Sequence, residues 1–299
     1  MKPTMLERVQ TYLAQRRALG YQLRVAGFWL RSFARYADRV QPHGGLTRAC
    51  ALHWACSPRD LQPATSAQRL QAVRRFAQFL VLSEPHTEIP SRYAFGPIGI
   101  RRPPHIYSAG QIRNLLARAR QLSGQLRPHT MATLLGLLAA TGLRIGEALR
   151  LDVRDVQIEE GWIVVRQSKY SRTRLVPLHS SALPPLRAYA RQRQRLFPLA
   201  CTFFVSERGT ALAHRTVCET FGHLRRDLGS AQNPPRLHDL RHTFACRVLL
   251  RCQTHSKPTG DPVLVLARYL GHATVRSTFW YLHASPALLA QVVRRFRSP

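Results

Sequence analysis

Acidic residues are scarce in this sequence. Asp and Glu together number 15 among 299 residues, against 45 Lys and Arg, so the formal net charge at pH 7 is +30. Lysine is scarcer still: all but three of the basic residues are arginine, whose planar guanidinium can hold two phosphate oxygens at once. This surplus exceeds what solubility requires and predicts a polyanionic partner, with nucleic acid as the first candidate.

Other absences restrict the class of protein further. No apolar run is long enough for a membrane span, and the first ten residues, MKPTMLERVQ, lack the hydrophobic core of a signal peptide. The six cysteines form no Cys-x-x-Cys pair, which favours reduced thiols. We therefore expect a soluble cytoplasmic protein with no membrane partner.

One group of potential metal ligands needs weighing. Cys50, His53 and Cys56 follow one another at i, i+3 and i+6 and could share one face of a helix. Three ligands without a fourth do not make a structural zinc site, so ordinary buried thiols are the simpler interpretation. The sequence also lacks a carboxylate cluster able to hold Mg²⁺, and we expect neither a metal nor another cofactor.

The length and the 45% hydrophobic content predict a globular protein of two domains. Residues 1–86 contain four segments with apolar residues at helical spacing, which predicts a helical domain. Residues 87–104 are rich in Pro, Gly and Arg and have no periodicity, which predicts an extended linker. Residues 105–299 form the second expected domain. Net charge is shared between residues 1–104 (+11) and 105–299 (+19), unlike a basic tail on a neutral enzyme.

The four helices of the first domain have recognisable starts and basic faces. Thr47 is expected to cap the third helix, and Ser66, following Pro63, the fourth. Arginines on their polar faces are expected to lie along a DNA backbone, although a solvated face is the simpler interpretation for any single one. These arginines are Arg16, Arg17, Arg24, Arg31, Arg35, Arg69, Arg74 and Arg75.

The second domain begins with helices. Ser108 starts a capping box, and the apolar segment 131–140 predicts a buried helix that ends at Gly142. Arg144 then opens a short helix with its head group leaving the core.

After these helices, residues 156–179 predict small antiparallel strands, with turns at 159–161 and 168–172 and with Lys169 at the tip of the second hairpin. The rest is expected to be helical, so the fold class is mainly α with a small antiparallel sheet. The expected helices cover residues 183–195, 213–228, 239–250, 262–270 and two segments flanking Pro286.

Six polar residues in this second domain make one chemically complete set. Two guanidiniums can hold the non-bridging oxygens of a phosphodiester, a lysine can protonate a leaving alkoxide, histidines can donate hydrogen bonds and shuttle protons, and a tyrosine can be the nucleophile. An aromatic run such as FWY at 279–281 ordinarily packs in a core. The other five residues of the set are the reason to interpret the Tyr281 hydroxyl as a nucleophile. In chain order the residues are Arg144, Lys169, His238, Arg241, His272 and Tyr281.

The order and context of these residues resemble the tyrosine recombinase (phage integrase) family. The matching strings are TGLRIGEALRL, SKYSRTRLVPL, HDLRH, LGH and the segment of Tyr281, and the resemblance covers nearly the whole chain. By this resemblance Arg144 and Arg241 bind phosphate and Lys169 is the general acid. The remaining roles implied are a base and hydrogen-bond donor at His238, a second donor at His272 and the nucleophile at Tyr281.

The resemblance implies a site-specific recombinase that forms a 3'-phosphotyrosyl intermediate. It implies a core-binding domain at 1–86, an integrase-type catalytic domain at 105–299, and a homotetramer on double-stranded DNA in the bacterial nucleoid. The long interval from Arg241 to His272 and the ending STFWYLHASPALL resemble transposon-encoded members, which act in integration, excision or transposition and can have companion recombinases.

Several alternatives stay open. A catalytically silent DNA-binding partner subunit, or an enzyme that relaxes DNA like a type IB topoisomerase, would share this architecture. Glu147 and His242 lie inside the motifs but are expected to be scaffold, and His283 is expected to lie on the surface of a helix. Residues 286–296, PALLAQVVRRF, carry an apolar stripe at helical spacing that could bury itself on its own domain or on a neighbouring copy.

Overall fold

The computed structural model divides the chain into two compact units, Met1–Arg101 and Arg102–Pro299, which are described separately. The residues that it describes are 3–57, 61–96, 103–166, 173–226, 228, 234–254, 261–271, 274 and 278.

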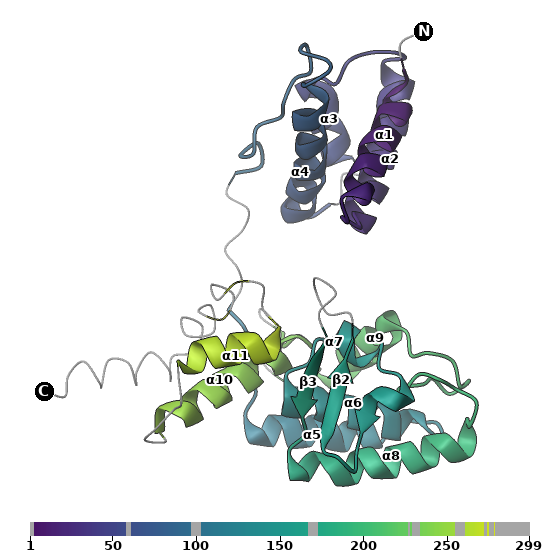
Figure 1. Ribbon diagram of the computed structural model, residues 1–299, viewed down its shortest axis with the longest axis vertical. Coiled ribbons are helices and arrows are strands. Elements are labelled where there is room, and N and C mark those ends of the chain that lie inside the picture. Colours follow the sequence, from purple (N-terminus) through teal and green to yellow (C-terminus); the bar gives the residue numbers. More distant parts are fainter. Residues whose placement is uncertain are drawn as a thin grey trace, which may run out of the picture. The chain divides into compact units, whose positions relative to one another are not determined.

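The first unit is a bundle of four helices, as predicted (Figure 1). Thr4 and Glu7 form a capping box at the start of the first helix, and the Thr47 hydroxyl accepts a hydrogen bond from the Cys50 N–H at the start of the third. Side chains such as Phe33, Trp54 and Phe76 fill the core between them. The helices are α1 (Met5–Ala18), α2 (Arg24–Val40), α3 (Arg48–Cys56) and α4 (Pro63–Leu80).

Two expectations for α4 are wrong. The helix begins at Pro63 rather than at Ser66, because proline suits the first helical position, and Ser66 is buried within the helix. Arg69 does not lie on a basic surface: its guanidinium donates to the backbone oxygens of Ser57 and Trp54 and stacks on the Trp54 ring. This arginine therefore holds α3 against α4.

The first unit continues into the segment expected to be a linker. Ile89 and Phe95 pack against the helical core, and the Glu88 carboxylate accepts a hydrogen bond from the Arg48 N–H. The thiols of α3 are expected to be buried, which is right for Cys50 and wrong for Cys56, whose position as the last residue of the helix leaves it exposed. Within the described residues no group of three or more His, Cys, Asp or Glu is arranged to hold a metal ion.

The second unit combines helices with a small sheet (Figure 1), which confirms the predicted fold class. Its three antiparallel strands lie in the order β1 (Val156–Gln157), β2 (Trp162–Val165) and β3 (Arg174–Pro177). Two 3₁₀ helices, η1 (Val153–Asp155) and η2 (Ser180–Ala182), flank the sheet. The helices are α5 (Ala109–Arg120), α6 (Arg127–Thr141), α7 (Ile145–Ala148), α8 (Leu183–Leu196), α9 (His214–Leu224), α10 (Asp239–Thr254) and α11 (Pro262–Leu270).

Helix α6 is the centre of the second unit. It is buried along most of its length and contacts α5, α8 and α10. Its start differs from the expected segment by four residues, and α9 ends at Leu224 rather than at residue 228; such shifts are common at helix ends. The expected helices flanking Pro286 lie outside the described residues. None of the described helices contains an apolar stretch long enough to cross a bilayer.

Candidate active site

The junction between α6 and α7 positions Arg144. Gly142 ends α6 in the left-handed conformation (φ 64°), as predicted, and a Cβ there would lie 2.5 Å from the Phe244 ring, so only glycine fits. Arg144 is the N-cap of α7, and its backbone N–H donates to the Glu147 carboxylate over 3.0 Å. The chain thus turns sharply and directs the Arg144 side chain out of the core.

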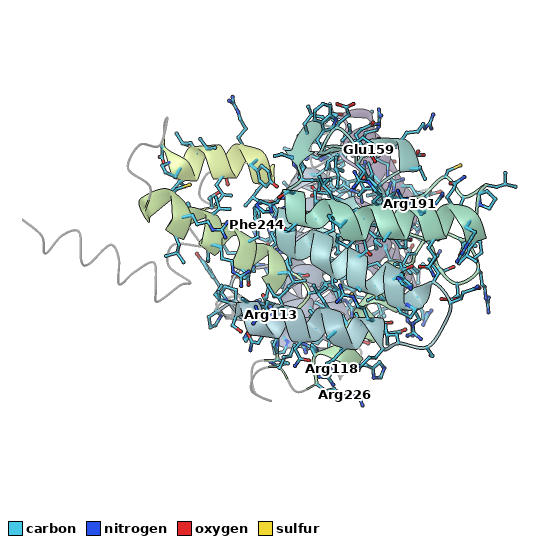
Figure 2. The ribbon with its side chains drawn as sticks, turned by 90° about the horizontal axis from the view of Figure 1, so that it is seen from below. Arg113, Arg118, Glu159, Arg191, Arg226 and Phe244 are labelled. Carbon is cyan, nitrogen blue, oxygen red and sulfur yellow. The ribbon has the colours of Figure 1, made fainter. Side chains whose placement is uncertain are left out.

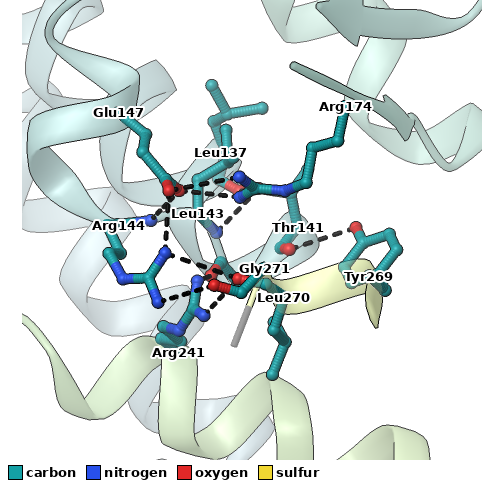
Figure 3. A network of polar contacts seen from close by, with 11 residues as sticks. Leu137, Thr141, Leu143, Arg144, Glu147, Arg174, Arg241, Tyr269, Leu270 and Gly271 are labelled. Carbon is teal, nitrogen blue, oxygen red and sulfur yellow. Dashed lines mark hydrogen bonds and ion pairs between the residues drawn. The ribbon is translucent and has the colours of Figure 1, made fainter. Parts of the chain in front are cut away.

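Arg241, in the first turn of α10, extends its side chain towards the junction between α6 and α7 that positions Arg144. It is 2% exposed, and its guanidinium donates to the carbonyl oxygens of Gly142 (2.7 Å) and Leu270 (2.6 Å). The Arg144 guanidinium also donates to Leu270 (3.4 Å) and to Gly271 (3.3 Å). Both arginines are therefore anchored on the C-terminal carbonyls of α11, where a helix carries partial negative charge (Figure 3).

Glu147 is the carboxylate of this network. Its oxygens accept from the Arg144 guanidinium (2.8 Å) and from Arg174 of β3 (2.8 and 3.2 Å). Burial acts to raise the pKa of Glu147, but the hydrogen bonds and charges of Arg174 and Arg144 outweigh it and lower the pKa to about 2. The carboxylate therefore stays ionised at any physiological pH.

The described part of this network carries surplus positive charge. The network contains the guanidiniums of Arg144, Arg174 and Arg241 and one carboxylate, that of Glu147, which pairs with Arg144 and Arg174 (Figure 3). The nearby Asp239 is buried, and its carboxylate accepts hydrogen bonds from the backbone N–H and the guanidinium of Arg236. Three guanidiniums against one carboxylate leave a net charge of +2, which suits an anion with more than one oxygen to hold.

His238 lies in the turn before α10, three residues from Arg241. Its ring meets the ring of His242 edge to face, with centroids 4.9 Å apart. The pKa of His238 is lowered by the protein near the ring and then by the charge of Arg241, although the residue as a whole is exposed to solvent. Burial followed by the His238 charge lowers the pKa of His242 to about 4. Both rings are therefore mainly neutral at pH 7, a state in which one imidazole nitrogen donates a hydrogen bond and the other can accept a proton.

The structure brings together two residues of the predicted set, Arg144 and Arg241, with His238 on the helix turn beside them. Three others, Lys169, His272 and Tyr281, lie outside the described residues, as does His283.

Glu147 was expected to be scaffold, and it links Arg144 to Arg174. Sequence reasoning missed Arg174, although a signal was present: it lies two residues from Val176 on β3, so the two share the inward face of the strand. An arginine on a buried face requires an acidic partner.

Comparisons with known proteins agree with this geometry. Residues 107–287 match the sequence profile of the Phage integrase family. A candidate integrase/recombinase of Sinorhizobium fredii, y4rB, is 36% identical over 98% of this chain and 96% of its own length. The tyrosine recombinase XerD of Caulobacter vibrioides is 30% identical over 79% of this chain and 76% of its own.

A solved structure shows that the fold is shared as well. The Tn1549 transposon integrase in complex with transposon right end DNA covers 98% of this chain and 99% of its own, with a TM-score of 0.71 and 16% identity. The chain belongs to the phage integrase family. It is a tyrosine-type site-specific DNA recombinase, as the sequence motifs predicted.

The buried Glu147 carboxylate leads to a prediction about stability. The substitution Glu147→Gln should lower the free energy of unfolding by about 3 kcal/mol at pH 7, because the ionised form is stabilised only in the folded state. A group whose pKa is lowered by folding contributes above its unfolded pKa, so the difference from the unsubstituted protein should narrow as pH falls from about 4.5 towards 2. Urea unfolding at several pH values measures it.

Glu159→Gln is the matched control. Glu159 also pairs with an arginine, Arg187, through both oxygens, but on an exposed surface, where ion pairs contribute little. A loss for Glu147→Gln no larger than the loss for Glu159→Gln would show that the buried network does not stabilise the fold.

Proposed function

We propose that this recombinase exchanges DNA strands through a phosphotyrosyl bond at Tyr281, with the surplus guanidinium charge around Arg144 and Arg241 holding the scissile phosphate. The observation that carries the proposal is that surplus: two arginines from distant segments are anchored together at the end of α11, while the described network supplies one carboxylate against three guanidiniums.

The chemistry follows from the groups available. The Tyr281 oxygen attacks phosphorus, the bond to the 5' oxygen breaks, and that oxygen takes a proton from Lys169. A neutral His238 accepts the tyrosine proton, Arg144 and Arg241 offset the charge that develops on the non-bridging oxygens, and His272 donates a further hydrogen bond. One phosphate ester replaces another, so the step needs no ATP, and attack by a free 5' hydroxyl reverses it.

The two arginines are suited to this role by how they are held. Their hydrogen bonds to the carbonyls of Gly142, Leu270 and Gly271 orient the guanidiniums without neutralising them, since a carbonyl carries only partial charge. A phosphate that binds here meets charges already in place, and such preorganised electrostatics lower a barrier without reorganisation at the moment of reaction.

We propose that the enzyme serves a mobile element, in integration, excision or transposition, and works in the cytoplasm on chromosomal DNA together with companion recombinases. The similarity to a transposon integrase supports this role. A silent partner subunit would form no covalent adduct with DNA, and a topoisomerase-like enzyme would relax supercoils without two paired sites. An adduct assay and a two-site exchange assay therefore separate these alternatives.

The nucleophile is tested by Tyr281→Phe. This change removes one hydroxyl and leaves the arginines, so affinity for DNA should stay within about twofold while the covalent protein–DNA adduct disappears. Denaturing gels of reactions on labelled substrate, with and without protease, measure the adduct. Persistence of the adduct in this variant would assign the nucleophile to another residue.

The general acid is tested by Lys169→Arg. The guanidinium of arginine stays charged near neutral pH and cannot release a proton to the leaving group. Cleavage should therefore fall by about 10² or more, while the affinity for DNA is kept. A substrate with sulfur at the 5'-bridging position has a leaving group that needs little protonation, and it should restore cleavage to this variant but not to Tyr281→Phe. If the sulfur substrate does not restore cleavage, Lys169 contacts the phosphate and another group is the general acid.

For the first unit we propose a DNA contact along α2. Arg31, Arg35 and Arg39 recur every four residues and line a concave surface of about 430 Å³, with Tyr36 and Trp54. Taken by itself, the second unit has basic side chains on α5 and after α9: Figure 2 shows Arg113, Arg118 and Arg226 in the lower part of that view.

Salt dependence tests the α2 surface. Each phosphate contact that is lost reduces the slope of log affinity against log salt by about one. Arg35→Gln should show this reduction at every DNA sequence tested, whereas Arg187→Gln, whose side chain pairs with Glu159, should not. Equal slopes for both variants and the unsubstituted protein would remove α2 from the DNA interface.

For the tetramer on DNA, we propose that residues 286–296 dock on the catalytic unit of a neighbouring copy. A groove of about 800 Å³ lies between α6, α10 and α11 and is lined by apolar residues that include Phe244 (Figure 2), Val248 and Leu266. Val265, on the groove, is 59% exposed. An apolar helical stripe from another copy fits a groove of this kind.

Truncation after Ser285 should therefore leave DNA binding by the monomer intact and abolish assembly of the tetramer. Val265→Glu should have the same effect, because it puts a charge into the groove. Leu264→Glu, at a neighbouring exposed residue (51%) that is not part of the groove lining, should assemble normally. Native gels and light scattering of the complexes measure assembly. Normal tetramers from the truncated chain would refute docking on a neighbour.

A further inference from the structure

Arg174 has two contacts at the candidate phosphate site, although no part of the proposed reaction uses it. It is the first residue of β3, paired with Val165 at the end of β2, and its side chain is only 13% exposed. Both terminal nitrogens of its guanidinium donate to Glu147, one to each carboxylate oxygen, over 3.2 and 2.8 Å. This is the two-pronged geometry in which arginine and carboxylate bind most strongly (Figure 3).

The carboxylate that Arg174 holds is the same one that holds Arg144. Glu147 Oε1 accepts from the Arg144 guanidinium and Oε2 from the Arg144 backbone N–H. If Arg174 were absent, the buried carboxylate would have Arg144 as the one guanidinium bonded to it in the described structure. It would then cancel the charge of Arg144 and compete with the phosphate for its N–H groups. With Arg174 present, the three side chains together keep a charge of +1.

The second contact is with the end of α11. A Cβ built on Gly271 would lie 3.1 Å from Arg174 Nη1 and 3.4 Å from Cζ, so the guanidinium packs where a side chain would otherwise be. Gly271 and Leu270 supply the carbonyls on which Arg144 and Arg241 are anchored. Arg174 therefore touches both supports of the phosphate-binding arginines.

We propose that Arg174 is a positioning residue that neutralises Glu147 and thereby leaves the charge of Arg144 available to the scissile phosphate. The inference rests on the proposed role of Arg144 as a phosphate ligand. Arg174 acts through Glu147, to which both of its terminal nitrogens donate, and is not assigned as a phosphate ligand.

The test measures covalent-adduct formation in single turnover by the full chain. Arg174→Met should slow cleavage by about 10- to 100-fold, the scale found for groups that orient a site from one contact away. Arg174→Lys, which keeps the charge but not the fork, should lie between Arg174→Met and the unsubstituted protein. Arg187→Met, at the exposed two-pronged pair with Glu159, is the control and should cleave normally.

Two further measurements separate positioning from a structural role or from direct contact. A methylphosphonate at the scissile position carries no charge, so it should largely remove the defect of Arg174→Met, as it should that of Arg144→Met. Adding Glu147→Gln to Arg174→Met should then increase cleavage by roughly threefold or more, because it removes the charge that Arg174 was needed to offset.

Each outcome has a definite meaning. Normal cleavage by Arg174→Met, an equal defect on both substrates, or no recovery in the double variant would overturn the inference. If Arg144→Met is also not rescued by the neutral substrate, the proposed phosphate role of Arg144 fails first, and the inference with it. Should Arg174→Met not fold, Arg174→Lys takes its place with the same substrate comparison, and an equal defect on both substrates overturns the inference.

Discussion

The structure of the site depends on keeping several like charges close together without cancelling them. Neighbouring guanidiniums repel one another, and removing each of them from water adds a desolvation free energy. Helix α11 offsets part of this cost with the partial charges of its last carbonyls, and Glu147 offsets part with one full charge. Because the compensation is incomplete, the described site keeps the surplus that an anionic substrate can satisfy.

The fold supplies these supports from segments far apart in sequence. Gly142 turns the chain where α6 ends, so that Arg144 leaves the core and the Gly142 carbonyl is exposed to Arg241. The Tyr269 hydroxyl donates to the Thr141 carbonyl, which ties α11 to the same turn. The helical core of α6 thus fixes the position of a site whose own side chains would not pack together unaided.

Local chemistry made much of this predictable. Cap residues predicted the helix starts at Thr47 and Ser108, and glycine geometry predicted the end of α6 at Gly142. The order of the motifs predicted that Arg144 and Arg241 lie in one site. Local sequence patterns could not predict which arginines of a helix are buried and which lie on its surface. Arg69 lies on a helix among other arginines, and its burial depends on Trp54 and Ser57, which the helical pattern of α4 does not include.

The central claim is that Arg144 and Arg241 each offset charge on the scissile phosphate, and stereochemistry tests it most directly. Cleavage by Arg144→Ala and Arg241→Ala is measured on the two separated diastereomers of a scissile methylphosphonate, each of which replaces a different non-bridging oxygen. If the guanidiniums hold the phosphate, each variant regains adduct formation with at least one diastereomer, relative to its activity on phosphate. Failure of both variants to regain activity with either diastereomer would contradict the account.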